Sequence, residues 1–219
     1  MPDKETQDYY RQRAETYEEI YYRDQPDRRK EIDDEVVRLR ELVTGKSVLE
    51  LACGTGYWTK IMSETANAIT ASDLSDEMLA IARHKPLVAP VTFQQADMFG
   101  HSWPQGAFDM VAVGFWFSHQ PRQEYERFFD LIATPLAKGG AIWLIDNNPP
   151  AEGPEHEHIR IDEFGNNFKR RHLKDGRTFT ILKNYFSEQE LRDLFSPRFT
   201  IRRLTYGVYY WSVELGVGS

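Results

Sequence analysis

Cysteine, long hydrophobic runs and an excess of positive charge are all scarce in this sequence. Its one cysteine, Cys53, cannot form an internal disulfide, so we expect a reducing, cytoplasmic location. Apolar stretches such as 110–117 are far shorter than the roughly 18 residues of a membrane span. Residues 1–5 are polar and acidic, so we expect no signal peptide.

The charge balance argues against one large class of partners. The chain has 27 basic and 34 acidic residues and a formal net charge of −7. Proteins that bind nucleic acids usually carry a basic surface for the phosphates, so we expect no nucleic-acid partner. The lack of a long apolar run likewise predicts no membrane association. A length of 219 residues with 41% hydrophobic residues predicts one domain with one sizeable core.

Two amphipathic helices are predicted within residues 1–44. The first is indicated by four residues at helical spacing: Tyr10, Ala14, Tyr17 and Tyr21. The second is indicated in the same way and ends before Gly45, with an apolar face of Ile32, Val36, Leu39 and Val43. Pro26 separates the two.

From residue 45 to residue 146 short apolar runs alternate with helical segments. The predicted strands are 47–51, 68–71, 91–93, 108–113 and 141–145, and the predicted helices are 58–64, one capped by Ser75, and 121–134. Strands that alternate with helices at this spacing predict an α/β domain whose parallel sheet is covered on both faces.

The last third departs from this alternation. Residues 149–167 are polar without a clear period, and we expect a long loop. Segments 168–173 and 177–183 flank a turn signal at 174–176, which predicts a β-hairpin within a cap segment, 147–186. In residues 187–219 a capping box at 187–190 predicts a helix, and 199–204 and 208–213 predict two antiparallel strands around Gly207.

The segment from Glu50 to Gly56 carries the strongest signal of function. Glycines at a strand-to-helix turn let a ligand approach the backbone, because no Cβ intrudes. A dinucleotide-binding motif would have a third glycine or alanine where Thr59 stands, and Glu50 would repel a pyrophosphate. Both residues disfavour an NAD-dependent oxidoreductase.

This segment resembles the first motif of the class I S-adenosylmethionine (SAM)-dependent methyltransferases. Asp73, at the end of the second strand, is similar to the family's ribose-binding acid, and Asp97, after the third, to its adenine-binding aspartate. Residues 108–111 and 136–140 resemble its later motifs. The resemblance implies a Rossmann-like, doubly wound, mostly parallel seven-stranded sheet with N-terminal lid helices and a β-hairpin cap inserted after strand five. It also implies SAM as cofactor and S-adenosylhomocysteine (SAH) as product.

Cofactor contacts are therefore predicted in the lid, in the glycine-rich turn and at the strand ends. Cys53 is interpreted as a small buried side chain rather than a nucleophile. For the tyrosines, plain core packing remains an alternative to a contact with the sulfonium. The predicted set is Tyr10, Tyr17, Glu50, Ala52, Cys53, Gly54, Thr55, Gly56, Trp58, Asp73, Leu74, Met78, Asp97, Met98, Phe99, Gly114 and Phe115.

Acceptor binding and catalysis are predicted just after the fourth strand and in the cap. Trp116 and His119 follow that strand at the edge where open α/β sheets bind ligands. His119 is a candidate base with a pKa of about 6.5, although a structural role is the alternative. Arginines suit an acidic group on the acceptor, unless the hairpin is simply solvated; the candidates are Arg170, Arg171 and Arg177.

A metal ion is not expected. Asp146 and Asn147 resemble the pair that holds magnesium in catechol-type methyltransferases, but Gly114 stands where those enzymes have an aspartate. Residues 155–158 contain potential ligands in a polar loop, which we interpret as solvated surface.

The sequence thus predicts an enzyme that methylates a small molecule, with the acceptor atom undetermined and the protein a monomer or homodimer. A non-catalytic SAM-binding or partner-binding protein of the same fold is the alternative.

Overall fold

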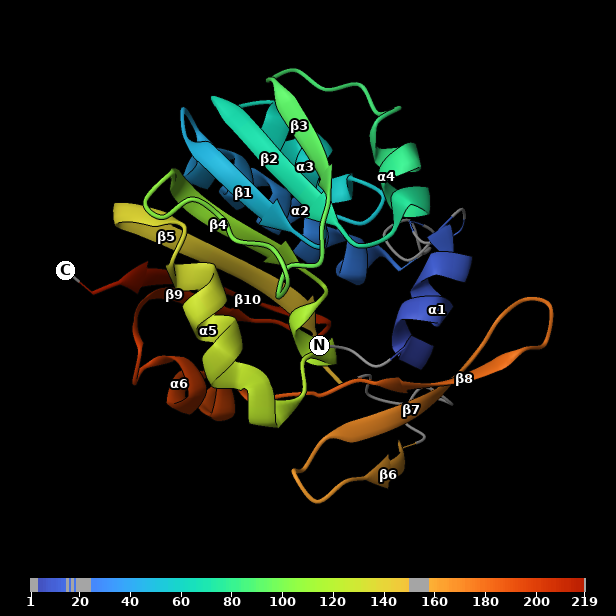
Figure 1. The fold of residues 1–219 in the computed structure, drawn as a ribbon. Helices are drawn as coiled ribbons and strands as arrows, with labels where there is room; N and C mark the ends of the chain where they lie inside the picture. Colours follow the sequence, from blue (N-terminus) through green and yellow to red (C-terminus); the bar gives the residue numbers. More distant parts are fainter. Residues whose placement is uncertain (1–3, 15, 17, 19–24, 150–157, 219) are drawn as a thin grey trace.

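The computed structural model describes residues 4–14, 16, 18, 25–149 and 158–218. A seven-stranded sheet forms the centre of the molecule, and β10 runs antiparallel to its two neighbours while β1 to β5 are parallel (Figure 1). In spatial order its strands are β3 (Val91–Gln95), β2 (Ala68–Asp73), β1 (Ser47–Leu51), β4 (Phe108–Gly114), β5 (Leu136–Asn147), β10 (Tyr210–Val217) and β9 (Phe199–Tyr206). This order confirms the predicted Rossmann-like, mostly parallel sheet.

Helices cover both faces of the sheet, because neighbouring side chains of each strand point to opposite sides. Val48 packs into the cluster that contains α2 (Pro26–Val43), α3 (Tyr57–Ser63) and α4 (Asp76–Ala82). Its neighbour Leu49 packs into the other cluster, with α5 (Tyr125–Ala133) and α6 (Glu188–Phe195). The apolar runs of the sequence are therefore buried on both faces, as a doubly wound sheet requires.

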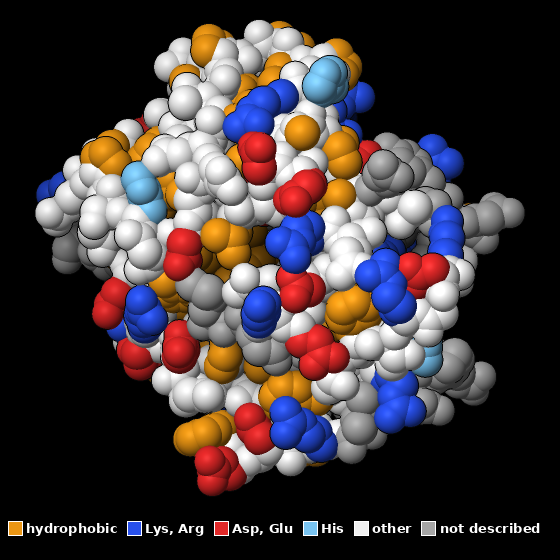
Figure 2. All heavy atoms as spheres, turned by 45° about the vertical axis from the view of Figure 1, so that its right-hand side comes forward, with side chains coloured by type: hydrophobic (Ala, Val, Ile, Leu, Met, Phe, Trp, Pro, Cys, Tyr) orange, Lys and Arg blue, Asp and Glu red, His pale blue; other side chains and the backbone are white. Residues whose placement is uncertain are grey.

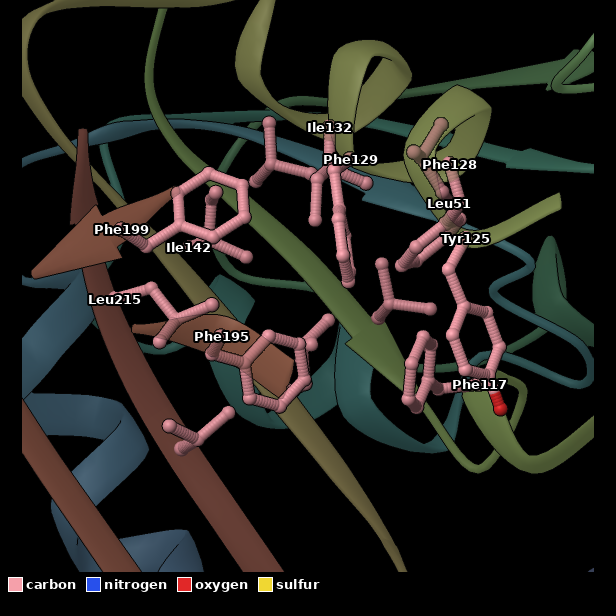
Figure 3. Close-up of a cluster of buried hydrophobic side chains, with 14 of the residues drawn as sticks. Leu51, Phe117, Tyr125, Phe128, Phe129, Ile132, Ile142, Phe195, Phe199 and Leu215 are labelled. Carbon is pink, nitrogen blue, oxygen red and sulfur yellow. The ribbon is translucent and has the colours of Figure 1, made fainter. Parts of the chain in front are cut away.

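Aromatic side chains fix the segment that follows β4. Phe117, in the short 3₁₀ helix η2 (Phe117–His119), points into the cluster under α5 and α6 (Figure 3). Its ring centroid lies 5.1 Å from that of Tyr125 and 5.6 Å from that of Phe195. Because Phe117 is anchored in the core, the flanking Trp116 and His119 are held at the edge of the sheet.

The cap is a three-stranded antiparallel sheet rather than a two-stranded hairpin. It comprises β6 (His158–Ile161), β7 (Asn167–His172) and β8 (Thr178–Leu182), in that order. The predicted hairpin is confirmed, and Gly176 at its turn has a φ of +86°. The expectation of a loop throughout 149–167 is wrong, because residues 158–161 pair with β7.

The N-terminal region differs from the predicted helix over residues 10–21. Helix α1 (Lys4–Gln12) begins earlier and ends before Ala14, and it lies against β8 (Figure 1). The predicted positions Tyr17 and Tyr21 lie outside the described residues. Pro26 opens α2 rather than lying in a linker, since a proline fits the first helical turn. In the described part of the chain, the helices are too short or too polar to cross a bilayer.

Candidate active site

A cavity of about 340 Å³ lies at the carboxyl ends of β1, β2 and β4, with α1 and α4 on its sides. Figure 2 shows the face on which it opens, a hollow with hydrophobic side chains inside and charged side chains around it. Open α/β sheets bind ligands at this edge, and the volume falls in the range of small-molecule pockets.

The turn after β1 exposes its backbone to the cavity. Gly54 has a φ of +56°, and a Cβ built on it would meet nothing within 4 Å. Gly56 also needs its positive φ of +79°, but a Cβ there would lie 2.9 Å from the Cβ of Ala82. Gly54 thus leaves room for a ligand, whereas Gly56 lets α4 pack against the turn. Ala52, with a φ of 55°, begins this change of direction.

Asp73 is fixed at the cavity wall by the turn that it faces. Its Oδ2 accepts the N–H of Gly54 at 2.8 Å, and its Oδ1 accepts the N–H of Ser75 at 2.9 Å. Burial raises the pKa of Asp73, and these N–H groups oppose that rise by stabilising the ionised form. A carboxylate oxygen has a second lone pair, so Asp73 can still accept hydrogen bonds from ligand hydroxyls.

Most of the predicted site residues line this cavity together. Asp97 lies on its wall and accepts the N–H of Phe99 at 3.0 Å, so it stabilises a turn as well as facing the cavity. The predicted residues on the wall are Tyr10, Ala52, Gly54, Asp73, Leu74, Met78, Asp97, Met98, Phe99, Gly114, Phe115, Trp116 and His119.

Glu50 lies behind the described wall. Its Oε2 accepts the Thr59 hydroxyl at 2.5 Å, and burial raises its pKa to about 8 against that hydrogen bond. At neutral pH Glu50 is therefore mostly a neutral acid rather than a free charge. Thr59, which distinguishes the motif from a dinucleotide-binding one, is the partner that makes this burial possible.

The other predicted residues missing from the described wall have partners elsewhere. Cys53 is buried, and burial raises the pKa of its thiol well above the usual value, which favours the neutral thiol over a thiolate. Thr55 donates its hydroxyl to Glu18 Oε1 at 2.7 Å. Trp58 is buried with its ring 5.0 Å from that of Trp143. Tyr17 lies outside the described residues.

Trp58 also explains the glycine at the end of β4. A Cβ on Gly114 would lie 2.5 Å from Trp58 Cδ1, so no side chain fits there. The next residue, Phe115, has a φ of 55°, and the chain turns toward the cavity. The aspartate that catechol-type enzymes need at this strand end is sterically excluded.

His119 is on the wall but is only 2% exposed. Its Nδ1 lies 2.6 Å from the carbonyl oxygen of Leu182, and its Nε2 lies 2.9 Å from the hydroxyl of Tyr10. Burial lowers the pKa of His119 to about 3, and the charge of Lys183 contributes to this. The predicted pKa near 6.5 is wrong, because the ring is desolvated beside a cation.

An ammonium group occupies the place considered for a metal. Lys183 Nζ lies 2.9 Å from Asp146 Oδ1, 3.1 Å from Asn147 Oδ1 and 2.6 Å from Ser118 Oγ. Among the described residues no group of three or more His, Cys, Asp or Glu side chains could hold a metal ion. Residues 155–157 and the side chain of His158 are outside that description.

The three predicted arginines differ in their surroundings, and none is on the described part of the wall. Arg177 is exposed and pairs with Asp175 at 2.6 Å within its own turn. Arg170 is exposed, and Arg171 is half-buried on the opposite face of β7. Arg171 is the one close enough to His119 to affect its pKa.

Sequence reasoning predicted a lid from the N-terminal helix but missed most of the α1 residues that line the cavity. The helix lines the cavity over more than one turn, although only Tyr10 was predicted there. A possible signal was the i, i+4 pair of Thr6 and Tyr10, one turn apart on one face. The unpredicted wall residues are Thr6, Gln7, Asp8, Arg11, Ser75, Asp76, Glu77, Gln95 and Ala96.

Comparisons with known proteins agree with this geometry. Residues 48–140 match a family described as "Methyltransferase domain". A demethylmenaquinone methyltransferase of Thermus thermophilus is 34% identical over 112 residues, which are 49% of this chain and 50% of the relative. The chain thus spans about half the length of the curated relatives that it matches.

Solved structures extend the similarity over the whole chain. DhpI in complex with SAH is 30% identical, with a TM-score of 0.77, and the match covers 98% of this chain and 96% of DhpI. DhpI in complex with SAM and HEP is 29% identical, with a TM-score of 0.78 and coverage of 96% and 95%. At 98% coverage of this chain, the match to DhpI with SAH includes the cap.

Proposed function

Because the chain belongs to the class I SAM-dependent methyltransferases, we propose that it transfers the methyl group of SAM to a small acceptor that carries an acidic group. The observation that carries the proposal is the cavity at the carboxyl ends of β1, β2 and β4, where Gly54, Asp73 and Asp97 meet. DhpI, which matches over almost its whole length, has been seen with SAM and with SAH.

The wall residues fit such a cofactor. Gly54 leaves open space for close approach, and Asp73 offers a carboxylate to the ribose hydroxyls. Asp97 would accept from the adenine amino group, beside the apolar surfaces of Met98 and Phe99. Tyr10, Gln7 and the other cavity residues of α1 would cover the ligand and exclude water.

When bound, SAM supplies a methyl group on a positively charged sulfur, which is already activated for in-line displacement. The residues of this chain therefore have to align the acceptor and keep water out, and a base is required only for a protonated acceptor. Neutral His119 has both ring nitrogens engaged in hydrogen bonds. An acceptor that arrives already ionised fits these surroundings best.

The charges around His119 support an acidic acceptor. Lys183 and Arg171 both lower the pKa of His119, because their positive charges raise the electrostatic potential at this end of the cavity. Asp146 opposes them, but it is bound to Lys183. An anionic group on the acceptor would be attracted by the remaining positive potential. Arg171 is thus the predicted arginine that we retain for acceptor binding, and Trp116 would offer an apolar surface beside it.

The test is to incubate the protein with methyl-labelled SAM and a pool of small carboxylic acids and phosphate monoesters, in parallel with their neutral amides and esters. We expect labelled product from an acid and none from its neutral counterpart, by mass spectrometry. Labelling of cationic acceptors alone would contradict the acidic-acceptor proposal. Binding of SAM without turnover on any acceptor would favour the non-catalytic alternative.

A further inference from the structure

Three hydrogen bonds link four residues from three segments at one side of the cavity, and the turn of α1 between Thr6 and Tyr10 closes them into a ring. Thr6 and Tyr10 lie one turn apart on α1. The N–H of Leu182 in β8 donates to Thr6 Oγ1 at 3.3 Å, and the carbonyl of Leu182 lies 2.6 Å from His119 Nδ1. The Tyr10 hydroxyl lies 2.9 Å from His119 Nε2.

The chemistry of the groups fixes the direction of these bonds. A carbonyl oxygen only accepts, so Nδ1 of His119 carries the proton and donates to Leu182. In a neutral imidazole Nε2 then has no proton, and it accepts the hydroxyl of Tyr10. His119 therefore connects α1 to β8 as a neutral side chain with one fixed tautomer.

The same helix covers the edge of the cap sheet. In the described part of the chain β8 is an edge strand, and its backbone N–H groups at Thr180 and Leu182 point outward. The side chains of Glu5 and Thr6 accept these two N–H groups, at 2.5 and 3.3 Å. Side-chain contacts hold α1 here instead of a strand ladder, so α1 can separate from β8 while the cap sheet stays formed.

Helix α1 also lines the cavity. Gln7, Asp8 and Arg11 belong to the cavity wall, together with Thr6 and Tyr10 of the ring. A ligand that fills the cavity is therefore covered by the same helix that the ring fastens to β8.

We propose that His119 is a positioning residue that fastens α1 over the cavity, and that opening of the Thr6–Leu182–His119–Tyr10 ring controls release of the spent cofactor. The proposal rests on the proposed function only in taking SAH as the ligand of the cavity. It gives His119 a role in ligand exchange instead of proton transfer.

Two substitutions remove single ring members with little change of shape. Tyr10→Phe keeps the aromatic ring, whose centroid lies 4.9 Å from that of His119, and removes the hydroxyl. Thr6→Val keeps the branched shape and removes Oγ1. The matched control is Tyr9→Phe, because the Tyr9 hydroxyl accepts from Arg13, 3.0 Å away, and is not part of the ring.

The experiment measures SAH dissociation by stopped-flow fluorescence and hydrogen exchange of residues 4–12 in the SAH complex. One hydrogen bond corresponds to roughly a threefold to tenfold effect, so we expect each ring variant to release SAH about threefold to tenfold faster. The double variant should release SAH faster still and exchange faster in α1. Tyr9→Phe should stay within about twofold of the unsubstituted protein.

The outcomes separate the two proposals. Equal SAH release from Tyr10→Phe, Thr6→Val and Tyr9→Phe, with equal exchange in α1, would overturn the ring as a fastening. Failure of the unsubstituted protein to bind SAH by calorimetry would overturn the proposed function itself. Melting temperatures within a few degrees, together with full SAH stoichiometry, show that a variant has folded.

Discussion

Burial holds two titratable side chains near the cavity in their neutral forms, with opposite consequences for stability. Glu50 has a pKa of about 8 in the folded protein, so between its ordinary value of 4.5 and 8 the folded state binds more protons than the unfolded state. Its contribution to stability is therefore lost as pH rises through that interval. For His119, whose pKa in the folded protein is about 3, the folded state binds fewer protons than the unfolded state. This residue therefore lowers the stability of the folded state as pH falls below 6.5.

Substitution of Glu50 by glutamine tests this charge state. Between pH 6.5 and 8, Glu50 contributes more than His119 to the pH dependence of stability. Each pH unit changes the free energy of unfolding by at most about 1.4 kcal/mol for one titrating group. From pH 6.5 to pH 8 the unfolding free energy of the unsubstituted chain should fall. We expect this fall to exceed that of Glu50→Gln by about 1 to 2 kcal/mol. Urea denaturation at both pH values measures the difference, and parallel profiles would show that Glu50 is ionised when folded.

Asp73 gives a prediction about affinity. A carboxylate that accepts two ligand hydroxyls is worth about 1.5 to 3 kcal/mol per bond, so Asp73→Ala should weaken SAH binding at least tenfold. Asp76→Ala is a matched control on the same part of the wall, since its carboxylate pairs with Arg83 on the surface. Calorimetry with SAH that gives the same affinity for both variants would remove Asp73 from the ribose site.

At the scale of elements, the end of β4 depends on the absence of a side chain. Gly114→Ala would place a Cβ 2.5 Å from Trp58, which α3 and the sheet hold in the core. We expect a loss of about 1 to 3 kcal/mol in unfolding free energy, as for other overpacked cores. Gly218→Ala is the control, because nothing lies within 4 Å of its added carbon. Equal denaturation midpoints would show that Trp58 moves aside at little cost.

The elements of the sheet could be predicted because their patterns are local and alternate regularly along the chain. The runs at Ser47–Leu51 and Phe108–Val113 are apolar on both faces, and only a covered parallel sheet buries such strands. The turn at residues 174–176 likewise revealed the β7–β8 hairpin. Strand β6 was missed because four residues, His158–Ile161, are too few to establish a period inside a polar segment, although their alternation of polar and apolar residues is a strand pattern.

The candidate site was predictable where backbone geometry decides the contact. Gly54, Asp73 and Asp97 follow strand ends, and the sheet order brings them to one cavity. Strand alternation places Lys169 and Arg171 on one face of β7, but the sequence could not indicate that Lys169 is buried there. Nor could spacing predict the environment of His119, because Lys183 and Leu182 reach it from the distant cap.

At the scale of the whole molecule, the buried ion pair of Lys183 and Asp146 joins the cap to the sheet. Lys183 and Asp146 are 5% and 0% exposed, and both also hold Ser118. Lys183→Met should cost about 3 to 5 kcal/mol of unfolding free energy, because it leaves a buried carboxylate without its cation. The double variant Lys183→Met, Asp146→Leu should lose less than the single one. Chemical denaturation that ranks the double variant as the less stable would contradict this account of the pair.

The position of β10 has a consequence for synthesis of the chain. This late strand lies between β5 and β9 and contributes Trp211, Val213 and Leu215 to the core. Until residues 199–217 leave the ribosome, β5 has no partner on that side, and a long apolar strand stays open to solvent. Open strand edges of this kind pair with other chains. The interval between translation of β5 and translation of residues 199–217 is therefore the one in which this strand edge is open to aggregation, and a chaperone that shields β5 would act then.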